Sequence, residues 1–382
     1  MNGPADRPLR VAVDASALRA ERTGIGCYVE KLLGCLAGSG IDLLPFSNRS
    51  VDGFPSASVR RLRPTALWLR LVAPGQARGL GPDLIHFPTG RASFSAGRPM
   101  VVTVHDLAPL SPAGLPRRER WLTAAALRRG IEAADAIIAV SADTAGAIRT
   151  RFPEAASRVT VIPEGPTVTV MDRALEPQAL RSLLGLTGAA PLWLHVGASE
   201  PRKRLPALVA AHAAALFRLR GDGRPDAALP VLVLAGPPGS DERRLRAAVA
   251  RGGSAPWVRL AGRLPRSALA GLYRMAELYI APSLHEGFGL AVLDAMGFGV
   301  PVLSSGRGAL GELATDGAAW IMDLDQPSTI ANGLLRLHRD PQLRLDLGAA
   351  GRLRAQGYSW ARAASATADL YRSLAPRPRG AA

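Results

Sequence analysis

Hydrophobic residues gather in short, nearly continuous runs along the whole chain, and longer amphipathic stretches separate these runs. Runs rich in β-branched and aliphatic residues predict strands that are buried on both faces, as in parallel sheets, and the amphipathic stretches predict connecting helices. Strands are predicted at residues 9–15, 83–87, 100–106, 136–141 and 158–163, and again at 192–198, 230–236, 257–262, 278–283 and 300–305. The alternation predicts an α/β fold with two Rossmann-like halves.

The pattern fades between residues 164 and 190, where Pro, Thr and Gly accumulate as in a linker. We therefore expect an N-terminal domain over residues 1–170 and a C-terminal domain over 185–358. A ligand site is expected in a cleft at the carboxyl ends of the strands. A last amphipathic stretch, residues 359–374, predicts a helix, and the tail after it is expected to be disordered.

The composition favours a two-domain enzyme without membrane spans. A chain of 382 residues exceeds one ordinary core, and no apolar run reaches the roughly 18 residues that a membrane-spanning helix needs. The N-terminus lacks the apolar core of a signal peptide, so a cytoplasmic location is expected. The net charge of +16 would favour binding to nucleic acid, to an anionic membrane or to phosphorylated ligands. The absence of a zinc-finger pattern, an aromatic RNA-binding signature and a long basic tail disfavours nucleic acid.

The cysteines and serines exclude several chemistries. Cys27 and Cys35 lie eight positions apart in one predicted helix, too far along its axis for a disulfide, and we interpret both as reduced packing residues. No serine lies in a Gly-x-Ser-x-Gly turn, and no His, Cys or Asp cluster has the spacing of a metal site. Hydrolase and metalloenzyme functions are therefore disfavoured.

The stretch EGFGLAVLD contains two acids, Glu286 and Asp294, around a glycine-rich turn. A helix is expected to start near Phe288, and its free N–H groups would form an anion site. Eight helical positions span roughly 12 Å, comparable to the distance from the sugar of a nucleotide sugar across its diphosphate to the ribose. The alternative is a pair of unrelated surface acids on an amphipathic helix.

Two further loops follow predicted strands with charged or glycine-rich sequences. After the strand that ends at Gly197, the sequence EPRKR supplies Arg202, Lys203 and Arg204, which could neutralise a diphosphate or could be solvated caps of the next helix. After the first strand, the sequence TGIG leads into a helix and permits close approach to phosphate at Gly24 and Gly26, although it could be only a turn.

The histidines at strand ends are candidates for contacts with a substrate. His105 and Asp106 end a predicted strand, where the histidine could donate a hydrogen bond or stabilise developing charge. Asp106 could orient the imidazole or cap the next segment, and a structural role for the pair stays open. His86 is a similar, weaker candidate, and His285 is expected to be loop structure.

Together these segments resemble the family 4 retaining glycosyltransferases, which have the GT-B fold of two Rossmann-like domains facing each other across a cleft. TGIGCY resembles the family's N-terminal glycine loop, and VTVHDL resembles its active-site histidine segment. AVSADT and VIPEG resemble the family's sequence segments that precede its interdomain linker, and VGASEPRKR is similar to its donor-diphosphate loop. PSLHEGFGLAVLDAMGFGVPVLSS resembles the family's donor-binding signature.

The resemblance implies a role for each matching residue. Glu286 would hold hydroxyls of the donor sugar, Arg202 and Lys203 would stabilise the departing nucleoside diphosphate, and His105 would lie near the anomeric centre. The donor would also be held by Gly24, Gly26, Gly287, Phe288, Gly289, Leu290 and Asp294. The first domain would bind the acceptor and the second the donor, and the helix at 359–376 would return to the first domain.

The activity implied is retaining, metal-independent transfer of a hexose such as mannose from a GDP- or UDP-linked donor, without a cofactor. The acceptor would be a glycan or a lipid-linked molecule in bacterial surface polysaccharide or glycolipid synthesis. A sugar-nucleotide epimerase or phosphorylase, or a non-catalytic nucleotide- or glycan-binding protein, is the alternative. The sequence departs from the family's pattern at four positions. It has Asp294 where the family usually has Glu, Ala291 where Pro is common, Phe298 where a small residue is usual, and Glu164 where Asn is frequent.

Two basic segments suggest contact with a membrane surface. Residues 59–72 and 115–130 interleave arginines with Trp and Leu, as interfacial segments do. We expect peripheral attachment to an anionic cytoplasmic leaflet, and ordinary basic helices packed on a sheet are the alternative.

Overall fold

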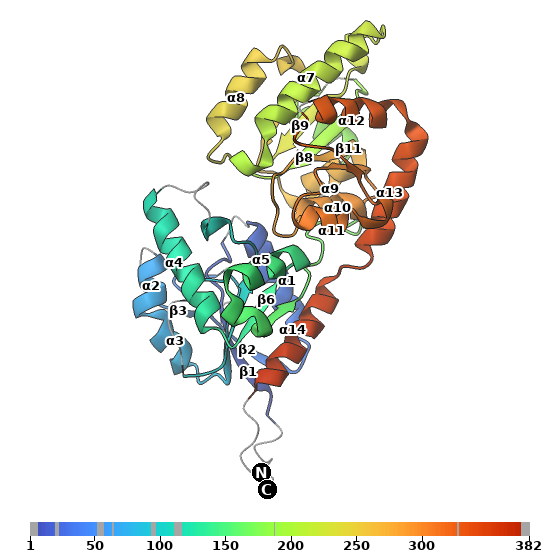
Figure 1. Ribbon diagram of the computed structural model, residues 1–382. Coiled ribbons are helices and arrows are strands. Elements are labelled where there is room, and N and C mark those ends of the chain that lie inside the picture. The colour runs from blue at the N-terminus through green and yellow to red at the C-terminus, as the bar shows by residue number, and fades with distance from the viewer. Residues whose placement is uncertain are drawn as a thin grey trace. The chain divides into compact units, whose positions relative to one another are not determined.

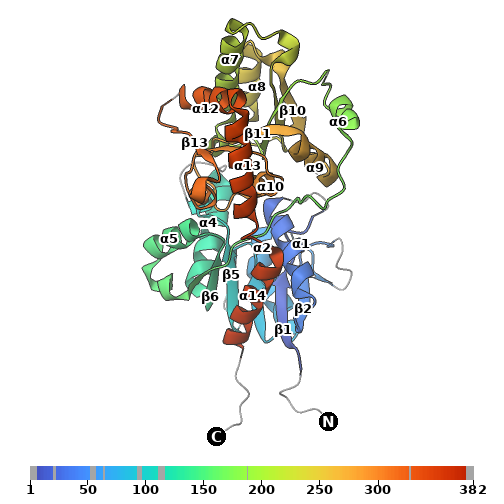
Figure 2. The same ribbon diagram turned by 90° about the vertical axis from the view of Figure 1, so that its right-hand side faces the viewer.

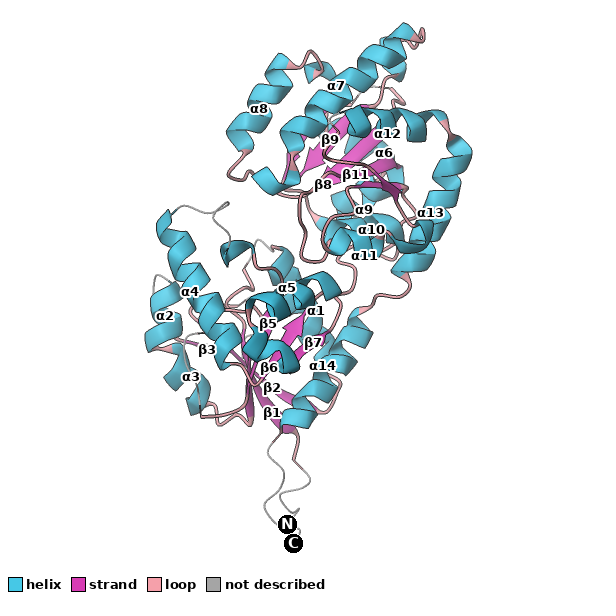
Figure 3. Ribbon diagram, in the orientation of Figure 1, coloured by secondary structure: helices cyan, strands magenta, loops and turns pink. Residues whose placement is uncertain are grey.

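The protein consists of two compact units. One comprises Met1–Gly165 with Ser359–Ala382, and the other comprises Pro166–Tyr358. The computed structural model describes residues 7–19, 23–51, 57–62, 65–92, 97–110, 117–186, 188–326 and 328–375. For residues 66 and 117–120 it describes the backbone but not the side chains. In each unit helices cover both faces of a parallel sheet (Figures 1 and 3). The predicted α/β architecture is confirmed.

The first unit contains a seven-stranded parallel sheet in the order β3-β2-β1-β4-β5-β6-β7. Its strands are β1 (Leu9–Asp14), β2 (Ile41–Ser47), β3 (Ser58–Val59), β4 (Leu84–Phe87), β5 (Met100–Val104), β6 (Ala136–Ala139) and β7 (Val159–Val161). The sequence pattern did not predict β2 and β3. Pro45 interrupts the apolar run of β2, and β3 is too short to show a pattern.

The helices of the first unit pack on the two faces of its sheet. They are α1 (Gly24–Leu36), α2 (Thr65–Leu71), α3 (Ala73–Gly79), α4 (Arg117–Ala133), α5 (Ala142–Arg151) and α14 (Trp360–Leu374), with the 3₁₀ turns η1 (Ala108–Leu110) and η2 (Pro153–Arg158). Ile85 and Phe87 of β4 join a core with α2 to α5. His86 between them points to the other face, where α1 and α14 pack side by side (Figure 2).

The second unit contains a six-stranded parallel sheet in the order β10-β9-β8-β11-β12-β13. Its strands are β8 (Leu192–Val196), β9 (Val231–Ala235), β10 (Val258–Gly262), β11 (Ala276–Ala281), β12 (Val302–Ser304) and β13 (Trp320–Ile321). The first five correspond to predicted runs. The two-residue strand β13 carries no periodic signal, so the sequence pattern did not predict it.

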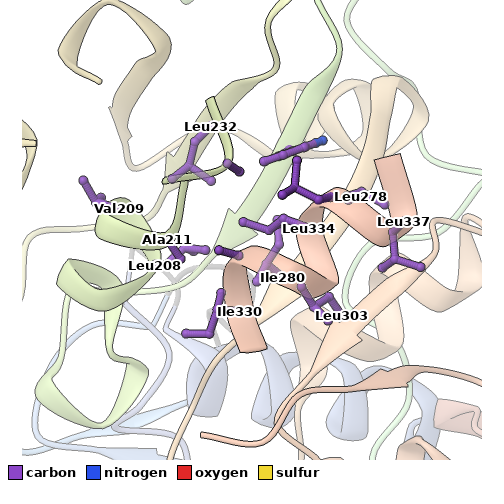
Figure 4. Packing of buried hydrophobic residues seen from close by; sticks show 14 of the residues in the cluster. Leu208, Val209, Ala211, Leu232, Leu278, Ile280, Leu303, Ile330, Leu334 and Leu337 are labelled. Carbon is purple, nitrogen blue, oxygen red and sulfur yellow. The ribbon is translucent and has the colours of Figure 1, made fainter. Parts of the chain in front are cut away.

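One hydrophobic core of the second unit lies between its sheet and four of its helices, α7, α8, α12 and α13. Figure 4 shows side chains of β9, β11 and α12 interlocking here, among them Leu232, Ile280 and Leu334. The second unit as a whole contains the helices α6 (Pro177–Leu183), α7 (Leu205–Gly221), α8 (Glu242–Arg251), α9 (Arg266–Met275), α10 (Leu290–Gly297), α11 (Ala309–Leu313), α12 (Ser328–Arg339) and α13 (Pro341–Ala355). Its 3₁₀ turns are η3 (Pro201–Lys203), η4 (Asp226–Ala228), η5 (Ala255–Trp257) and η6 (Thr315–Gly317). Burial of each large apolar side chain contributes roughly 1.5–3 kcal/mol.

Some local predictions differ from the structure. The segment expected to be a linker belongs to the second unit from Pro166 onward and contains α6. Both cysteines lie in α1 and neither forms a disulfide within the described residues, but Cys35 is exposed because it faces solvent on this amphipathic helix, so its predicted packing role is wrong. The tail predicted to be disordered, from residue 376 onward, lies outside the described residues. Among the helices described, none combines the length and apolar character needed to span a bilayer.

Candidate functional site

In the second unit, the loops that follow β8 and β11 meet at the carboxyl edge of the sheet. The two strands are neighbours and parallel, so their following loops emerge side by side. The backbone N–H of Leu284 donates to the carbonyl of Arg202 at 2.7 Å, which joins the loops. The structure thus brings together the EPRKR loop and the EGFG turn, as the sequence predicted for one ligand site.

Glu286 is the centre of this arrangement. Its Oε2 accepts a hydrogen bond from Nη1 of Arg202 at 2.5 Å, and its Oε1 lies 3.1 Å from Nζ of Lys203. The hydroxyl of Ser283 also donates to Oε1 at 2.8 Å. Sequence reasoning missed Ser283.

The charges around Glu286 favour its ionised form strongly. Burial raises the pKa of Glu286, but the charges of Lys203 and Arg202, with the hydrogen bonds from Arg202 and Ser283, lower it to about 2. Nε of Arg202 also donates to Oε2 of Glu200 at 2.8 Å, so two cations face two carboxylates and the four charges sum to zero, 2 − 2 = 0. The side chains of Lys203 and Glu286 keep 13% and 15% of their surface exposed, so the cluster can reach a ligand.

The chain conformation aims the three cations of the loop in different directions. Gly197 has φ +156°, and a Cβ at this position would lie 2.5 Å from Nζ of Lys203, so a larger residue would displace the lysine from Glu286. Arg202 also donates to the carbonyl of His285 at 3.1 Å. Arg204 has φ 51° and donates to the carbonyl of Leu324 at 3.1 Å, away from Glu286. Of the three predicted cations, Arg202 and Lys203 therefore face Glu286, whereas Arg204 has a structural role.

The helix after the EGFG turn begins later than predicted. α10 starts at Leu290 rather than near Phe288, because Gly289 adopts a left-handed conformation with φ 104° and acts as its N-cap. No side chain caps this end. Phe288 is 7% exposed and lies edge-on to Tyr358 with ring centroids 5.8 Å apart, so its ring is part of the core. Amides at the start of α10 remain candidates for phosphate contact.

Asp294, the second acid of the signature, is buried inside the second unit. Its Oδ1 accepts from the backbone N–H groups of Thr167 at 2.7 Å and Val168 at 3.1 Å, and its Oδ2 accepts from the Thr167 hydroxyl. Asp294 is 2% exposed. Burial raises the pKa of Asp294, and despite these three hydrogen bonds it reaches about 7. A contact with a ribose requires residues 167–168 to leave this carboxylate.

In the first unit, His105 lies just after β5 with an acceptor at each ring nitrogen. Nδ1 is 2.9 Å from Oε1 of Glu164, and Nε2 is 2.9 Å from the carbonyl of Pro88. Burial lowers the pKa of His105, but the hydrogen bond and charge of Glu164, with the Pro88 carbonyl and the charge of Asp106, outweigh this effect and raise it. The ring is therefore held as an imidazolium.

Glu164 is the functional residue that sequence reasoning missed. It is 2% exposed, and its second oxygen, Oε2, has no hydrogen-bond partner within the described residues. Its substitution for the Asn that is frequent in the resembled family was a visible signal. Asp106, which was considered for the task of orienting His105, instead accepts a hydrogen bond from the backbone of Ala108 at 3.0 Å.

His86, the weaker candidate, is part of the core. Its Nε2 lies 2.8 Å from the Thr103 hydroxyl, and its Nδ1 lies 2.6 Å from the Tyr371 hydroxyl on α14. The Thr103 hydroxyl also contacts that of Tyr28 on α1, at 3.0 Å. Burial lowers the pKa of His86 to about 3. This hydrogen-bonded chain joins the sheet to α1 and α14, and the histidine is structural.

The glycine loop of the first unit forms the start of α1. Thr23 is the N-cap, and its side chain accepts a hydrogen bond from the backbone N–H of Gly26 at 3.2 Å. The amide of Gly26 therefore serves the cap, while Gly24 is exposed. Tyr28, one turn further along, places its ring edge-on to His105 with centroids 4.7 Å apart.

The two basic segments differ in how their aromatic residues are used. Trp68 of α2 is fully buried and donates to Gln76 at 3.0 Å, so it is not interfacial. Trp121 of α4 is 72% exposed and Leu71 of α2 is 66% exposed, and the two helices pack against each other. Residues 63–64 of the first predicted segment and 115–116 of the second lie outside the described part of the chain. Across the described residues, no group of three or more His, Cys, Asp or Glu is placed to hold a metal ion.

Two family descriptions match the chain, Glycosyltransferase Family 4 over residues 23–167 and Glycosyl transferases group 1 over residues 182–354. The chain is 31% identical to a D-inositol 3-phosphate glycosyltransferase of Streptomyces avermitilis over 419 residues, covering 96% of the chain and 88% of the relative. Its fold is similar to sucrose-phosphate synthase from Thermosynechococcus elongatus, with a TM-score of 0.76 and 22% identity over 96% of this chain and 99% of the other. Anabaena Alr3699/HepE, solved with UDP-glucose, has a TM-score of 0.73 and 20% identity over 96% and 100%.

Proposed function

Because the chain belongs to the glycosyltransferases of family 4 and group 1, we propose that it transfers a hexose from a nucleotide sugar to a hydroxyl group of an acceptor. The observation that carries the proposal is the contact of Arg202 and Lys203 with Glu286 in the second unit. An acid for sugar hydroxyls and two cations for a diphosphate are what recognition of a nucleotide sugar needs.

The two cations have the main chemical task. As the bond between the anomeric carbon and the phosphate oxygen breaks, negative charge grows on the departing nucleoside diphosphate. Arg202 can hold phosphate oxygens with its planar fork, and Lys203 supplies a point charge. Both already lie against Glu286, so the donor enters a preorganised site, and Glu286 keeps its ionised form to accept hydrogen bonds from sugar hydroxyls.

Metal independence follows from the same charges. Arg202 and Lys203 supply two positive charges for the diphosphate, the task that a divalent cation performs in other transferases. The expected result is turnover that is unchanged by a chelator. A loss of turnover with EDTA that Mg²⁺ or Mn²⁺ restores would contradict this part of the proposal.

Retention of the anomeric configuration is the proposed stereochemical outcome. A front-face reaction, in which the acceptor hydroxyl attacks from the side that the diphosphate leaves, needs no covalent nucleophile. The two carboxylates that interact with His105 electrostatically, Glu164 and Asp106, are engaged by the imidazole and by the Ala108 amide. NMR of the first product, before mutarotation or further reaction, tests this, and an inverted anomer would refute retention.

His105 is proposed to contribute positive charge near the sugar rather than to abstract a proton. Both of its nitrogens face acceptors, so neither is available as a base. Glu164 is the positioning residue that holds the ring in this state. The roles proposed for Gly24, Gly287, Phe288, Gly289 and Leu290 rest on backbone amides that approach the donor. Gly26, whose amide donates to Thr23, is proposed to hold the donor through the close approach that a residue without a side chain allows.

Two features bear on the donor and the acceptor. HepE, of similar fold, was solved with UDP-glucose, so UDP-glucose is the donor to test first, beside the GDP-linked hexoses that the sequence resemblance suggests. The relative from Streptomyces avermitilis is named for D-inositol 3-phosphate, so a phosphorylated polyol joins the glycan and lipid-linked acceptors suggested by the sequence. The exposed Trp121 and Leu71 support peripheral contact with an anionic membrane.

A thermal-shift panel of nucleotide sugars tests the proposal. A ligand that binds only the folded protein raises its melting temperature by mass action. One donor should stabilise the wild type, and Glu286→Gln, which keeps the side-chain shape but loses the charge, should lose most of that shift. No stabilisation by any nucleotide sugar would contradict the proposed function.

A further inference from the structure

An aromatic ring packs against the imidazole of His105 in the first unit. Tyr28 of α1 meets it edge-on, with ring centroids 4.7 Å apart and an angle of 87° between the ring planes. The hydrogen bonds of the two ring nitrogens, to Glu164 and to the Pro88 carbonyl, still allow the imidazole to tilt about the line that joins them. A buried ring held at a right angle to the imidazole restricts this tilt. The place of Tyr28 therefore sets the plane of the imidazole.

The first residue of α14 supports both Tyr28 and the segment that carries Glu164. The ring of Trp360 lies edge-on to that of Tyr28, with centroids 5.7 Å apart. A Cβ at Gly165 would lie 2.5 Å from the backbone nitrogen of Trp360, so the missing side chain lets the start of α14 pack against the residue that follows Glu164. Helices α1 and α14 also pack side by side (Figure 2). Helix α14 thus contacts two of the segments that surround His105.

A buried chain of hydrogen bonds also ties the hydroxyl of Tyr28 to α14. Its oxygen lies 3.0 Å from the Thr103 hydroxyl, which lies 2.8 Å from Nε2 of His86. Nδ1 of His86 lies 2.6 Å from the hydroxyl of Tyr371. None of these four residues is more than 2% exposed. Tyr371 lies about three helical turns after Trp360, so α14 holds Tyr28 both at its ring and, through the chain, at its hydroxyl.

The links of this chain depend on one another. Burial lowers the pKa of His86 to about 3, so its ring is neutral, with one nitrogen that donates and one that accepts. The bond to Tyr371 at one nitrogen therefore determines whether the other donates to Thr103 or accepts from it. Burial raises the pKa of Tyr28 and of Tyr371, so both hydroxyls keep their protons. A buried polar chain whose groups are all paired specifies one arrangement, which an apolar core of the same shape does not.

We propose that Tyr28 is a positioning residue that fixes the plane of the His105 imidazolium. Tyr371 of α14 holds Tyr28 in place through the hydrogen-bonded chain. The effect on sugar transfer rests on the proposed function, because His105 acts there as a positive charge near the sugar. The positioning itself is a property of the first unit and needs no substrate. The alternative is that the chain only fastens α14 to the sheet and has no influence on His105.

NMR of the full chain without substrate tests the positioning, through the exchange of the His105 ring N–H protons with water. Tyr28→Leu removes the packed ring, so these protons should exchange at least about tenfold faster than in the wild type. Tyr28→Phe keeps the ring and removes only the hydroxyl, so most of the protection should return. Tyr371→Phe breaks the far end of the chain and should still speed the exchange of the His105 protons.

A double variant tests the chain itself. Tyr28→Phe and Tyr371→Phe break the same chain, so each should speed the exchange by about two- to fivefold, and the double variant should match the single ones. Independent effects would multiply in the double variant, and that result overturns the chain. These two variants also decide the question if Tyr28→Leu does not fold.

Sugar transfer reports the consequence for catalysis. Tyr28→Leu should lower kcat by about tenfold or more, because a misplaced charge stabilises the reaction less. The KM of the donor should stay unchanged, because the proposed donor contacts, Arg202 and Lys203, lie in the second unit. Faster ring exchange with an unchanged kcat would support the positioning and contradict the role proposed for His105. The donor panel with Glu286→Gln reports on the proposed function separately.

The matched control is Tyr273→Phe in the second unit. The hydroxyl of Tyr273 donates to the Ala291 carbonyl at 3.2 Å and the residue is 1% exposed, so this variant also loses one buried hydroxyl group. Its His105 protons should exchange like those of the wild type. Unchanged exchange in Tyr28→Leu, or equally fast exchange in Tyr273→Phe, overturns the positioning. A Tyr371→Phe protein that unfolds at lower urea concentration but keeps the wild-type exchange overturns the link to α14.

Discussion

Oε1 of Glu164 lies 2.9 Å from Nδ1 of His105, and the carbonyl of Pro88 faces the other ring nitrogen at the same distance. A carboxylate and a carbonyl can only accept hydrogen bonds, so both imidazole nitrogens must carry protons. The groups that face the ring are Glu164, Asp106, the edge-on ring of Tyr28 and the neutral His86. His105 is therefore a fixed cation whose charge depends on Glu164.

The first prediction concerns Glu164→Gln. Without the carboxylate, burial becomes the largest effect and lowers the pKa of His105 below its ordinary value, so the ring is neutral at pH 7.5. Turnover at that pH should fall by about 10–100-fold, the range typical for loss of a carboxylate that orients a functional histidine. In the wild type, activity should decline as pH rises through the raised pKa of His105, and the variant should show this decline at a lower pH.

The measurement is the pH profile of kcat, together with the ¹⁵N shifts of the His105 ring. Glu154→Gln, an exposed acid in the same unit, is the matched control and should keep the wild-type profile. An unchanged profile in Glu164→Gln, or a wild-type ring that carries one proton at neutral pH, would refute the imidazolium.

The second prediction separates two arginines of one loop. Arg202 contacts Glu286, whereas Arg204 turns to the Leu324 carbonyl. Arg202→Ala removes a group that stabilises the leaving diphosphate, so kcat should fall by about 10²–10³-fold. Arg204→Ala should cost less than about tenfold in kcat and act mainly on stability, by about 1 kcal/mol for the lost hydrogen bond. Steady-state kinetics and urea unfolding of both variants test this, and equal losses of kcat would contradict it.

The third prediction concerns the buried acid Asp294. Its pKa is raised to about 7 from an ordinary value of 3.8, so the folded protein binds this proton more tightly than the unfolded chain does. The resulting stabilisation is complete below about pH 4 and is lost as pH rises toward and through 7. Asp294→Asn keeps the shape and an acceptor oxygen without this ionisation.

Asp294→Asn should therefore gain stability relative to the wild type between pH 5 and pH 8, by on the order of 1–3 kcal/mol in the free energy of unfolding. Urea unfolding at both pH values measures it, and Asp346→Asn, an exposed acid on α13, is the control. Asp294→Ala should destabilise by about 1–3 kcal/mol, because it leaves the amides of Thr167 and Val168 without an acceptor. A difference between Asp294→Asn and wild type that does not change with pH would show that Asp294 does not titrate as described.

The sequence predicted the elements whose patterns are local. The buried strands of both units appear as apolar runs, whereas β2 is obscured by Pro45 and β13 has only two residues. The meeting of the Arg202 and Glu286 loops was predictable, because parallel strands end at one edge of a sheet. The left-handed conformation of Arg204, which turns it away from this meeting point, has no signature in an EPRKR sequence.

Long-range partners explain the remaining differences. Asp294 meets Thr167 across 127 positions of sequence, and His105 meets Glu164 across 59. Periodicity carries no information on such pairs. The one sequence signal was Glu164 itself, because the resembled family frequently has Asn at this position.

The fourth prediction tests the membrane hypothesis. Trp121 is 72% exposed on α4, beside α2 with its exposed Leu71. Trp121→Ala should reduce flotation with vesicles of anionic phospholipid severalfold at low salt, because interfacial Trp contributes strongly to binding. Phe217→Ala removes a side chain that is 78% exposed on α7 of the other unit, and it should leave flotation unchanged. Equal effects of both variants, or no flotation of the wild type, would sink the hypothesis.

The central claim is that Arg202, Lys203 and Glu286 form the donor site of a glycosyltransferase. The most direct test is release of nucleoside diphosphate with formation of a glycoside, measured by mass spectrometry for the wild type, Lys203→Ala and Glu286→Gln over a panel of donors and phosphorylated acceptors. The wild type should transfer the sugar from one donor, and both variants should lose at least about 10²-fold in turnover. Unchanged transfer by both variants, or interconversion of nucleotide sugars without an acceptor, would contradict the claim.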